Sequence, residues 1–149
     1  MIRLETSKRS GIDNLQIFDI SAFERNWNAR IPKLHPRAEQ RTAASPIYNC
    51  HGLTFACRRT RVTEAGSIKR ILQDDSWTEV LMADSLPGDI VIYYSDDGDP
   101  NHSGIVLEKN NLGIPKICSK WGSAGEFNHL LTDHPSIYGP TARFYRCNL

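Results

Sequence analysis

The sequence predicts an α+β domain in which N-terminal helices pack on an antiparallel β-sheet. Helix caps and helical spacing of apolar residues occur in the first half of the chain, whereas the second half alternates short apolar runs with turn residues. Helices followed by strands are typical of α+β domains. A length of 149 residues without an internal repeat indicates one domain.

The first helix is expected to begin after Asp19 or Ser21, because either residue is a good N-cap. Residues 30–46 contain three prolines and little apolar periodicity, which predicts a surface connection. A second helix is expected at or just after Asn49, with Gly66 able to close the stretch. This start places Cys50 in the first turn.

A third, short helix fits residues 67–73, where Ile68, Ile71 and Leu72 have the spacing of one buried stripe and Ser67 is the expected cap. The pattern then changes to strands. The loops between them, DDGDPN and KNNLG, are rich in turn residues, as hairpin loops are. The strands are expected at 89–94, 103–108, 115–120 and 142–147.

Composition excludes several classes of protein. With 18 Lys and Arg against 17 Asp and Glu, the net charge is +1, so a basic face for nucleic acid is not expected. No apolar run is long enough for a membrane span, and the opening MIRLETSKRSGIDNL lacks the apolar core of a signal peptide. The expectation is a soluble chain, cytoplasmic as made, whose four cysteines are reduced.

Cys50 is the residue with the clearest chemical potential. In the first turn of a helix, the macrodipole and free backbone N–H groups favour a thiolate and can hold an oxyanion. A thiolate nucleophile needs an imidazole partner, and His102 opens the strand after the DDGDPN turn. A small buried hydrophobe is the alternative interpretation of Cys50.

Three segments together resemble the NlpC-type cysteine peptidases, a papain-like family related to the CHAP amidases. NCHGLTFA resembles the segment around the family's nucleophile, WTEVLMADSLPGDIVIYY its P-G-D strand, and NHSGIVLE the strand that carries its catalytic histidine. Their order fits, with 52 residues from Cys50 to His102. The resemblance covers roughly residues 46–146. It implies a papain-like catalytic core over 46–149, with 1–45 as an N-terminal extension or helical lead-in.

The resemblance implies cleavage of an amide bond, by default in a peptidoglycan peptide, with Cys50 as nucleophile and His102 as general base and acid. Asn49 replaces the family's Asp and His51 its usual Ser, so the pocket beside the nucleophile is altered. We expect His51 to line it. The strand after the histidine strand usually supplies the residue that orients the imidazole.

That strand offers Cys118, Ser119 and Lys120 at the approximate position of the third residue. We place His129 ahead of Ser119, because an imidazole orients His102 better than a hydroxyl. Tyr48 is expected to donate its hydroxyl to the developing oxyanion, and Trp121 to form a wall of the substrate cleft. The alternative for each is a buried residue of the core.

No cofactor or metal is expected. The cysteines and histidines lack CxxC or HxxxH spacing, which argues against zinc, and no Gly-rich phosphate loop occurs. Without a signal peptide or wall-binding repeat, the sequence fits a toxin effector delivered by a secretion machine, a phage lysis enzyme or a cytoplasmic enzyme. A toxin implies a cognate inhibitor protein as partner. The alternatives are a deamidase or acyltransferase acting on a protein, and a catalytically silent papain-like binding module.

Overall fold

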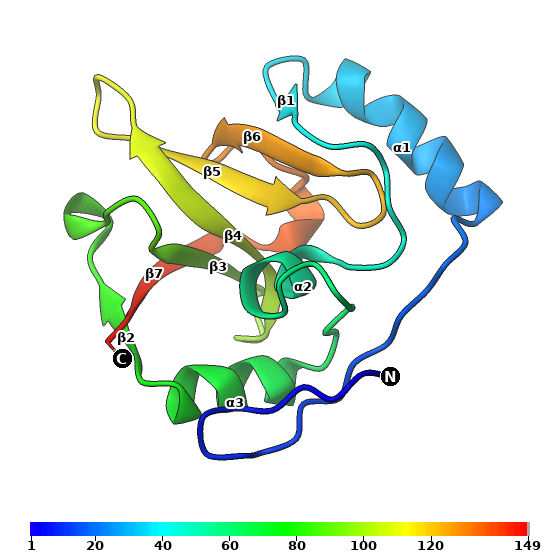
Figure 1. Ribbon diagram of the computed structural model, residues 1–149. Coiled ribbons are helices and arrows are strands. Elements are labelled where there is room, and N and C mark those ends of the chain that lie inside the picture. The colour runs from blue at the N-terminus through cyan, green and yellow to red at the C-terminus, as the bar shows by residue number, and fades with distance from the viewer. Residues whose placement is uncertain (149) are drawn as a thin grey trace.

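The computed structural model describes residues 1–148 as an α+β domain with a seven-stranded antiparallel sheet (Figure 1). The strand order is β1-β6-β5-β4-β3-β7-β2. The helices are α1 (Ala22–Leu34), α2 (Cys50–Phe55) and α3 (Ala65–Asp74), with 3-10 turns η1 (Met82–Asp84) and η2 (Ser136–Tyr138). The strands are β1 (Glu39–Gln40), β2 (Trp77–Val80), β3 (Ile90–Tyr94), β4 (Pro100–Lys109), β5 (Pro115–Lys120), β6 (Glu126–Leu130) and β7 (Thr141–Cys147).

The four expected strands are confirmed as β3, β4, β5 and β7, within a few residues at each end. Strands β1, β2 and β6 were not predicted. Strand β6 carries Glu126 and Asn128 on one face, where apolar residues usually mark a buried strand. Glu126 is buried nevertheless, because Arg58 neutralises its charge. Pairing with β5 therefore depends on contacts that no local pattern reveals.

The expected start of α1 is confirmed. Ser21 caps the helix, since its hydroxyl accepts from the Glu24 N–H at 3.1 Å and the Glu24 carboxylate accepts from the Ser21 N–H. The helix continues through Pro32 to Leu34, so the start of the predicted connection is helical. Pro32 lies in the last turn and, having no N–H, cannot donate to the carbonyl four residues earlier. Within residues 1–148, no helix is long and apolar enough to span a membrane.

The start of α2 after Asn49 is confirmed, but the expected ends of this helix and the cap of the next one are wrong. Helix α2 stops at Phe55 because Cys57 and Arg58 have positive φ angles of 49° and 64°, which turn the chain away. Gly66 instead lies inside α3, whose N-cap is Glu64. The arginine-rich stretch is therefore a turn and not the continuation of a helix.

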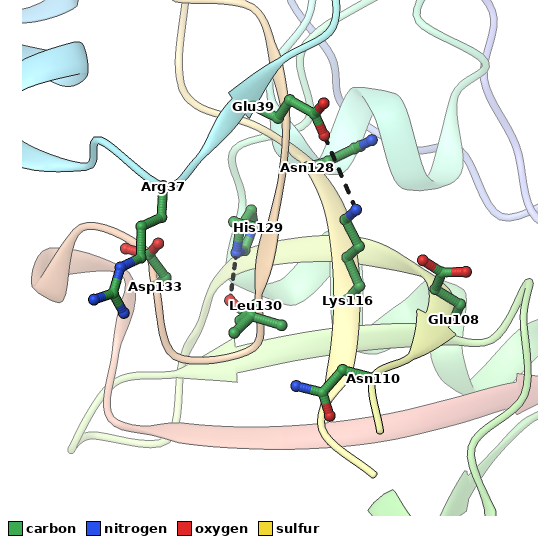
Figure 2. Close-up of a pocket in the computed structure, with 9 residues that line it drawn as sticks. All are labelled: Arg37, Glu39, Glu108, Asn110, Lys116, Asn128, His129, Leu130 and Asp133. Atoms are coloured by element: carbon green, nitrogen blue, oxygen red, sulfur yellow. Dashed lines mark hydrogen bonds and ion pairs between the residues drawn. The ribbon is translucent and has the colours of Figure 1, made fainter. Parts of the chain in front are cut away.

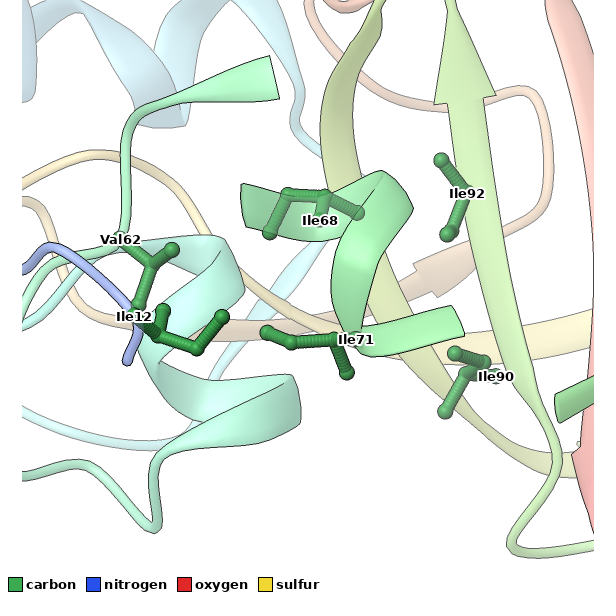
Figure 3. Packing of buried hydrophobic residues seen from close by; sticks show 6 residues of the cluster. All are labelled: Ile12, Val62, Ile68, Ile71, Ile90 and Ile92. Atoms are coloured by element: carbon green, nitrogen blue, oxygen red, sulfur yellow. The ribbon is translucent and has the colours of Figure 1, made fainter. Parts of the chain in front are cut away.

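Two helices pack on one face of the sheet, the face that carries Ile92, Ser103 and Cys118, here called the helix face. Leu53 of α2 contacts Cys118, and Ile68 of α3 packs against Ile92. Figure 3 shows Ile68 and Ile71 of α3 beside Ile90 and Ile92 of β3, in a cluster that also contains Ile12 and Val62. The expected packing of helices on a sheet is thus confirmed for α2 and α3.

The opposite face, which carries Tyr93, His102 and Ser119, has a core of its own. Tyr93 and neighbouring apolar strand residues pack there with Leu131, which follows β6. Helix α1 also belongs to this side, because its Ile31 packs with Phe127, and Phe127 pairs with Ser119. In Figure 1, α1 lies beside β1 and β6. Helix α1 therefore lies on the side of the sheet opposite α2 and α3.

The core of the helix face can be tested with Ile68→Ala. Ile68 is fully buried, so we expect its truncation to lower the free energy of unfolding by about 2–5 kcal/mol. Gln73→Ala, on the exposed side of the same helix, is the control and should change it by no more than about 0.5 kcal/mol. Urea unfolding measures both. Equal effects would contradict the packing of α3 on β3.

Candidate functional site

Cys50 is the first residue of α2 and is buried. The Asn49 side chain holds this start in place, since its Oδ1 accepts from the N–H groups of Gly52 and Val62 and its Nδ2 donates to the Val62 carbonyl. The backbone N–H of Ser103, the residue that follows His102, lowers the pKa of the Cys50 thiol. The start of α2 therefore lies near the strand that carries the expected base.

His51 joins α2 to the start of β4. Its Nε2 lies 3.0 Å from the Pro100 carbonyl oxygen, which can only accept, so Nε2 carries the proton. Its Nδ1 therefore accepts from the Ser103 hydroxyl at 2.8 Å. Thr54 lies 2.9 Å from the same hydroxyl. His51 was expected to line the substrate pocket, and the structure places its ring inside the protein with both nitrogens bonded.

His102 is completely buried, on the opposite face of the sheet. Its ring stacks on Tyr138 of η2, with 3.8 Å between centroids and 7° between planes, and lies 5.5 Å from the Tyr93 ring. Neither ring nitrogen has a hydrogen-bond partner within residues 1–148, Cys50 included. Buried polar side chains almost always have partners, so this imidazole requires an explanation.

Burial keeps both groups neutral in this conformation. It raises the pKa of the Cys50 thiol to about 11, although the N–H groups of Ser103, His51 and Cys50 itself and the charge of Lys120 act in the other direction. Burial also holds the pKa of His102 well below its ordinary value, and His129, His51 and His134 add to this effect. A thiolate–imidazolium pair therefore needs a more polar environment than the closed site provides.

The candidate third residues, His129 and Ser119, are bonded to each other. His129 Nδ1 donates to the Leu130 carbonyl at 2.8 Å, so its Nε2 accepts from the Ser119 hydroxyl at 2.7 Å. The indole N–H of Trp121 donates to the same hydroxyl at 2.9 Å. Both candidates lie on the face of the sheet that carries His102, but within residues 1–148 neither bonds to its ring.

Tyr48 and Trp121 are also engaged inside the protein. The Tyr48 hydroxyl donates to the Glu126 carboxylate at 2.5 Å, and Arg58 binds the same carboxylate at 2.6 Å. Trp121 is fully buried and stacks on Phe127, with 4.4 Å between ring centroids. Their expected roles toward substrate stay predictions.

Lys120 was named only among the residues near the position of the third residue, and the structure buries it completely. Its Nζ donates to the carbonyl oxygens of Ser45, Tyr48 and Gly122 at 2.7, 3.2 and 2.6 Å. Lysine is rarely buried, so a strand pattern gives no reason to expect it inside. The available signal was its position on the same strand face as Cys118.

A pocket of about 310 Å³ lies near the start of β5, beside Lys116 (Figure 2). Arg37 and Lys116 line it together with the carboxylates of Glu39, Glu108 and Asp133. Neither Cys50 nor His102 contributes to this pocket. Cys50 and His102 are therefore buried away from solvent, whereas the open pocket is lined by side chains of both charges.

The structure gives no support to a metal centre. Within residues 1–148, no group of three or more His, Cys, Asp or Glu side chains is arranged to hold a metal ion. The four cysteines are free thiols, two buried, one partly buried and one exposed. Thiol chemistry is the chemistry that these residues support most directly.

The chain matches no model of a known protein family, and no curated protein or solved structure is significantly similar to it. The resemblance to the NlpC-type peptidases thus stays an inference from the three motifs. The interpretation of the site depends on its own geometry.

The buried histidines predict a loss of stability in mild acid. Burial lowers the pKa of His51 and of His129 from 6.5 to about 4, so between these values the unfolded chain binds more protons than the folded one. The free energy of unfolding should fall from pH 7 to pH 5 by about 2 kcal/mol per histidine. This window lies above the ordinary titration of carboxylates.

Urea unfolding at a series of pH values measures this slope. In His51→Gln the slope should be smaller, because one proton fewer is taken up on unfolding. A free energy of unfolding that is constant between pH 7 and pH 5 would show that these imidazoles are not kept neutral by burial.

Proposed function

We propose that this protein is a thiol-dependent amide hydrolase in which Cys50 is the nucleophile and His102 the general base and acid. The observation that carries the proposal is a fully buried imidazole, with neither nitrogen paired within residues 1–148, on the strand whose Ser103 N–H favours the thiolate of buried Cys50. An unsatisfied buried polar group costs about 1–3 kcal/mol. Such a cost is typical of a residue kept for a reaction.

In the proposed reaction His102 takes the proton from the Cys50 thiol, and the thiolate attacks the carbonyl carbon of an amide. The N–H groups of Cys50, His51 and Ser103, which favour the thiolate, are the proposed donors to the developing oxyanion. The imidazolium then gives its proton to the leaving amine as the C–N bond breaks. His102 next takes a proton from water, whose oxygen attacks the thioester, and the released thiolate regains that proton.

The substrate follows from the resemblance and not from the geometry. NlpC-type relatives imply an amide in a peptidoglycan peptide, which fits a toxin effector paired with a cognate inhibitor, or a phage lysis enzyme. His129 remains the proposed third residue, and its hydrogen bond to Ser119 fixes its ring on the His102 side of the sheet. Deamidation of a protein or acyl transfer would use the same thioester intermediate.

A second function, a catalytically silent binding module, is favoured by the closure of the site. Thiol and imidazole are both neutral, and within residues 1–148 no hydrogen bond joins them. Under this alternative the buried thiol reacts no faster than an ordinary one. Reactivity of Cys50 therefore separates the two functions.

Alkylation by iodoacetamide, followed by mass spectrometry across pH, tests the nucleophile. If His102 activates the thiol, Cys50 should be labelled at pH 7 faster than a model thiol, whose pKa is about 8.5, and His102→Ala should slow this labelling. Exposed Cys57 is the internal control, and its rate should not depend on His102. Labelling of Cys50 that is slower than Cys57 and unchanged in His102→Ala would support the binding module.

Turnover of peptidoglycan fragments, followed by chromatography of the released peptides, tests the reaction. Cys50→Ala should abolish cleavage in a folded protein, and His102→Ala should lower it by at least about 100-fold. Cys57→Ala should leave it intact. Parallel rates for His129→Ala and Ser119→Ala decide the third residue: equal, unchanged rates would exclude both. Ammonia release from a protein substrate, without peptide cleavage, would instead identify a deamidase.

A further inference from the structure

Lys120 is fully buried, and all three protons of its ammonium group are bonded inside the protein. It ends β5 on the helix face, and its three ammonium protons meet three carbonyl oxygens. The Nζ also lies 4.6 Å from the centre of the Tyr48 ring, which favours a cation. Because all its donors are used, Lys120 has none left for a substrate.

Two of its three acceptors belong to the segment that leads into α2. The carbonyls of Ser45 and Tyr48 precede Cys50, whereas the carbonyl of Gly122 belongs to the turn after β5. The same segment is held by a second cation, because Arg61 Nε donates to the Pro46 carbonyl at 2.6 Å. Backbone carbonyls without regular secondary structure are thus fixed by buried positive charge.

We propose that Lys120 is a positioning residue for Cys50: its ammonium ion fixes the segment 45–48 that carries Cys50 into α2 and places a positive charge near the sulfur. The inference deepens the proposed function, on which it rests for the role of Cys50. Lys120 touches no substrate in this scheme. It acts by holding the nucleophile and by favouring its thiolate form.

The charges around both groups agree with this role. Lys120 faces Arg61, Glu126, Glu24 and Cys50. Burial and then Arg61 lower its pKa to about 8, while the carboxylates and the thiol oppose this shift, so the ammonium form prevails at pH 7.

Cys50 in turn is surrounded by groups from several elements. His51 belongs to its own helix, Lys120 ends β5, and Tyr138 of η2 lies within electrostatic reach. His102 precedes Ser103, whose N–H lowers the pKa of the thiol. Lys120 is the cation in this set at neutral pH, because burial keeps both imidazoles uncharged.

The variant Lys120→Met tests the proposal, because methionine keeps an unbranched side chain as far as Cε and removes the charged Nζ with its donors. Iodoacetamide labelling of Cys50 across pH is measured together with thermal unfolding. We expect the midpoint of the labelling profile to rise by about one pH unit and the rate at pH 7 to fall about 10-fold. A folded variant with an unchanged midpoint would overturn the proposal.

Lys116→Met is the matched control. Lys116 lies on the same strand and the same face, but it is partly exposed and pairs with Glu39 at 3.9 Å. Its variant should label like the unchanged protein. The proposed function is tested separately, because it fails if His102→Ala leaves Cys50 labelling unchanged. The effect of Lys120→Met on the midpoint of the labelling profile is measured in either case.

If Lys120→Met does not fold, reductive methylation of the unchanged protein takes its place. Formaldehyde and borohydride at pH 7 should modify Lys116 and leave Lys120 intact, because its ammonium group is buried and bonded. An unmodified Lys120 supports the fixed ammonium ion. Methylated Lys120 with unchanged labelling of Cys50 would overturn it.

Discussion

The hydrogen bonds from His51 to the start of β4 connect the two parts of the candidate site. They join residues 49 and 52 positions apart in the chain, and they set where α2 begins relative to the strand. Cys50 directly precedes His51, and His102 directly precedes Ser103. The hydrogen bonds of His51 therefore also fix the backbone positions of Cys50 and His102 relative to each other. The Ser103 N–H therefore influences the Cys50 thiol, although α2 and the His102 ring belong to opposite faces of the sheet.

Burial and reactivity compete in this site. Closing Cys50 and His102 away from water makes their charged forms costly, which explains why both are neutral here. The same low-polarity surroundings would strengthen any interaction with a developing oxyanion. Tyr138, stacked on His102, forms part of this closure. The N–H groups of Ser103, His51 and Cys50 and the buried cation of Lys120 offset part of this cost for a thiolate.

Much of the fold could be predicted, because it depends on local rules. Ser21 and Asn49 mark helix starts through side-chain capping, and the four strands with strong apolar patterns were found. The end of α2 could not be predicted, since a non-glycine residue such as Arg58 adopts a left-handed conformation there. Arg58 also reaches the buried Glu126 carboxylate, a contact between residues far apart in the chain. Strand β6 was not predicted, because Glu126 indicates an exposed position unless its ion pair with Arg58 is known.

The sequence by itself determined that Cys50 opens a helix and that His102 lies on a strand, because capping and alternation act over a few residues. Only the tertiary structure decided which side chains these two residues meet. The face of His102, the partners of His51 and the three carbonyls around Lys120 depend on strand register and on chain segments that meet across the fold. Register is set by the whole sheet, since a shift of one residue would reverse every face.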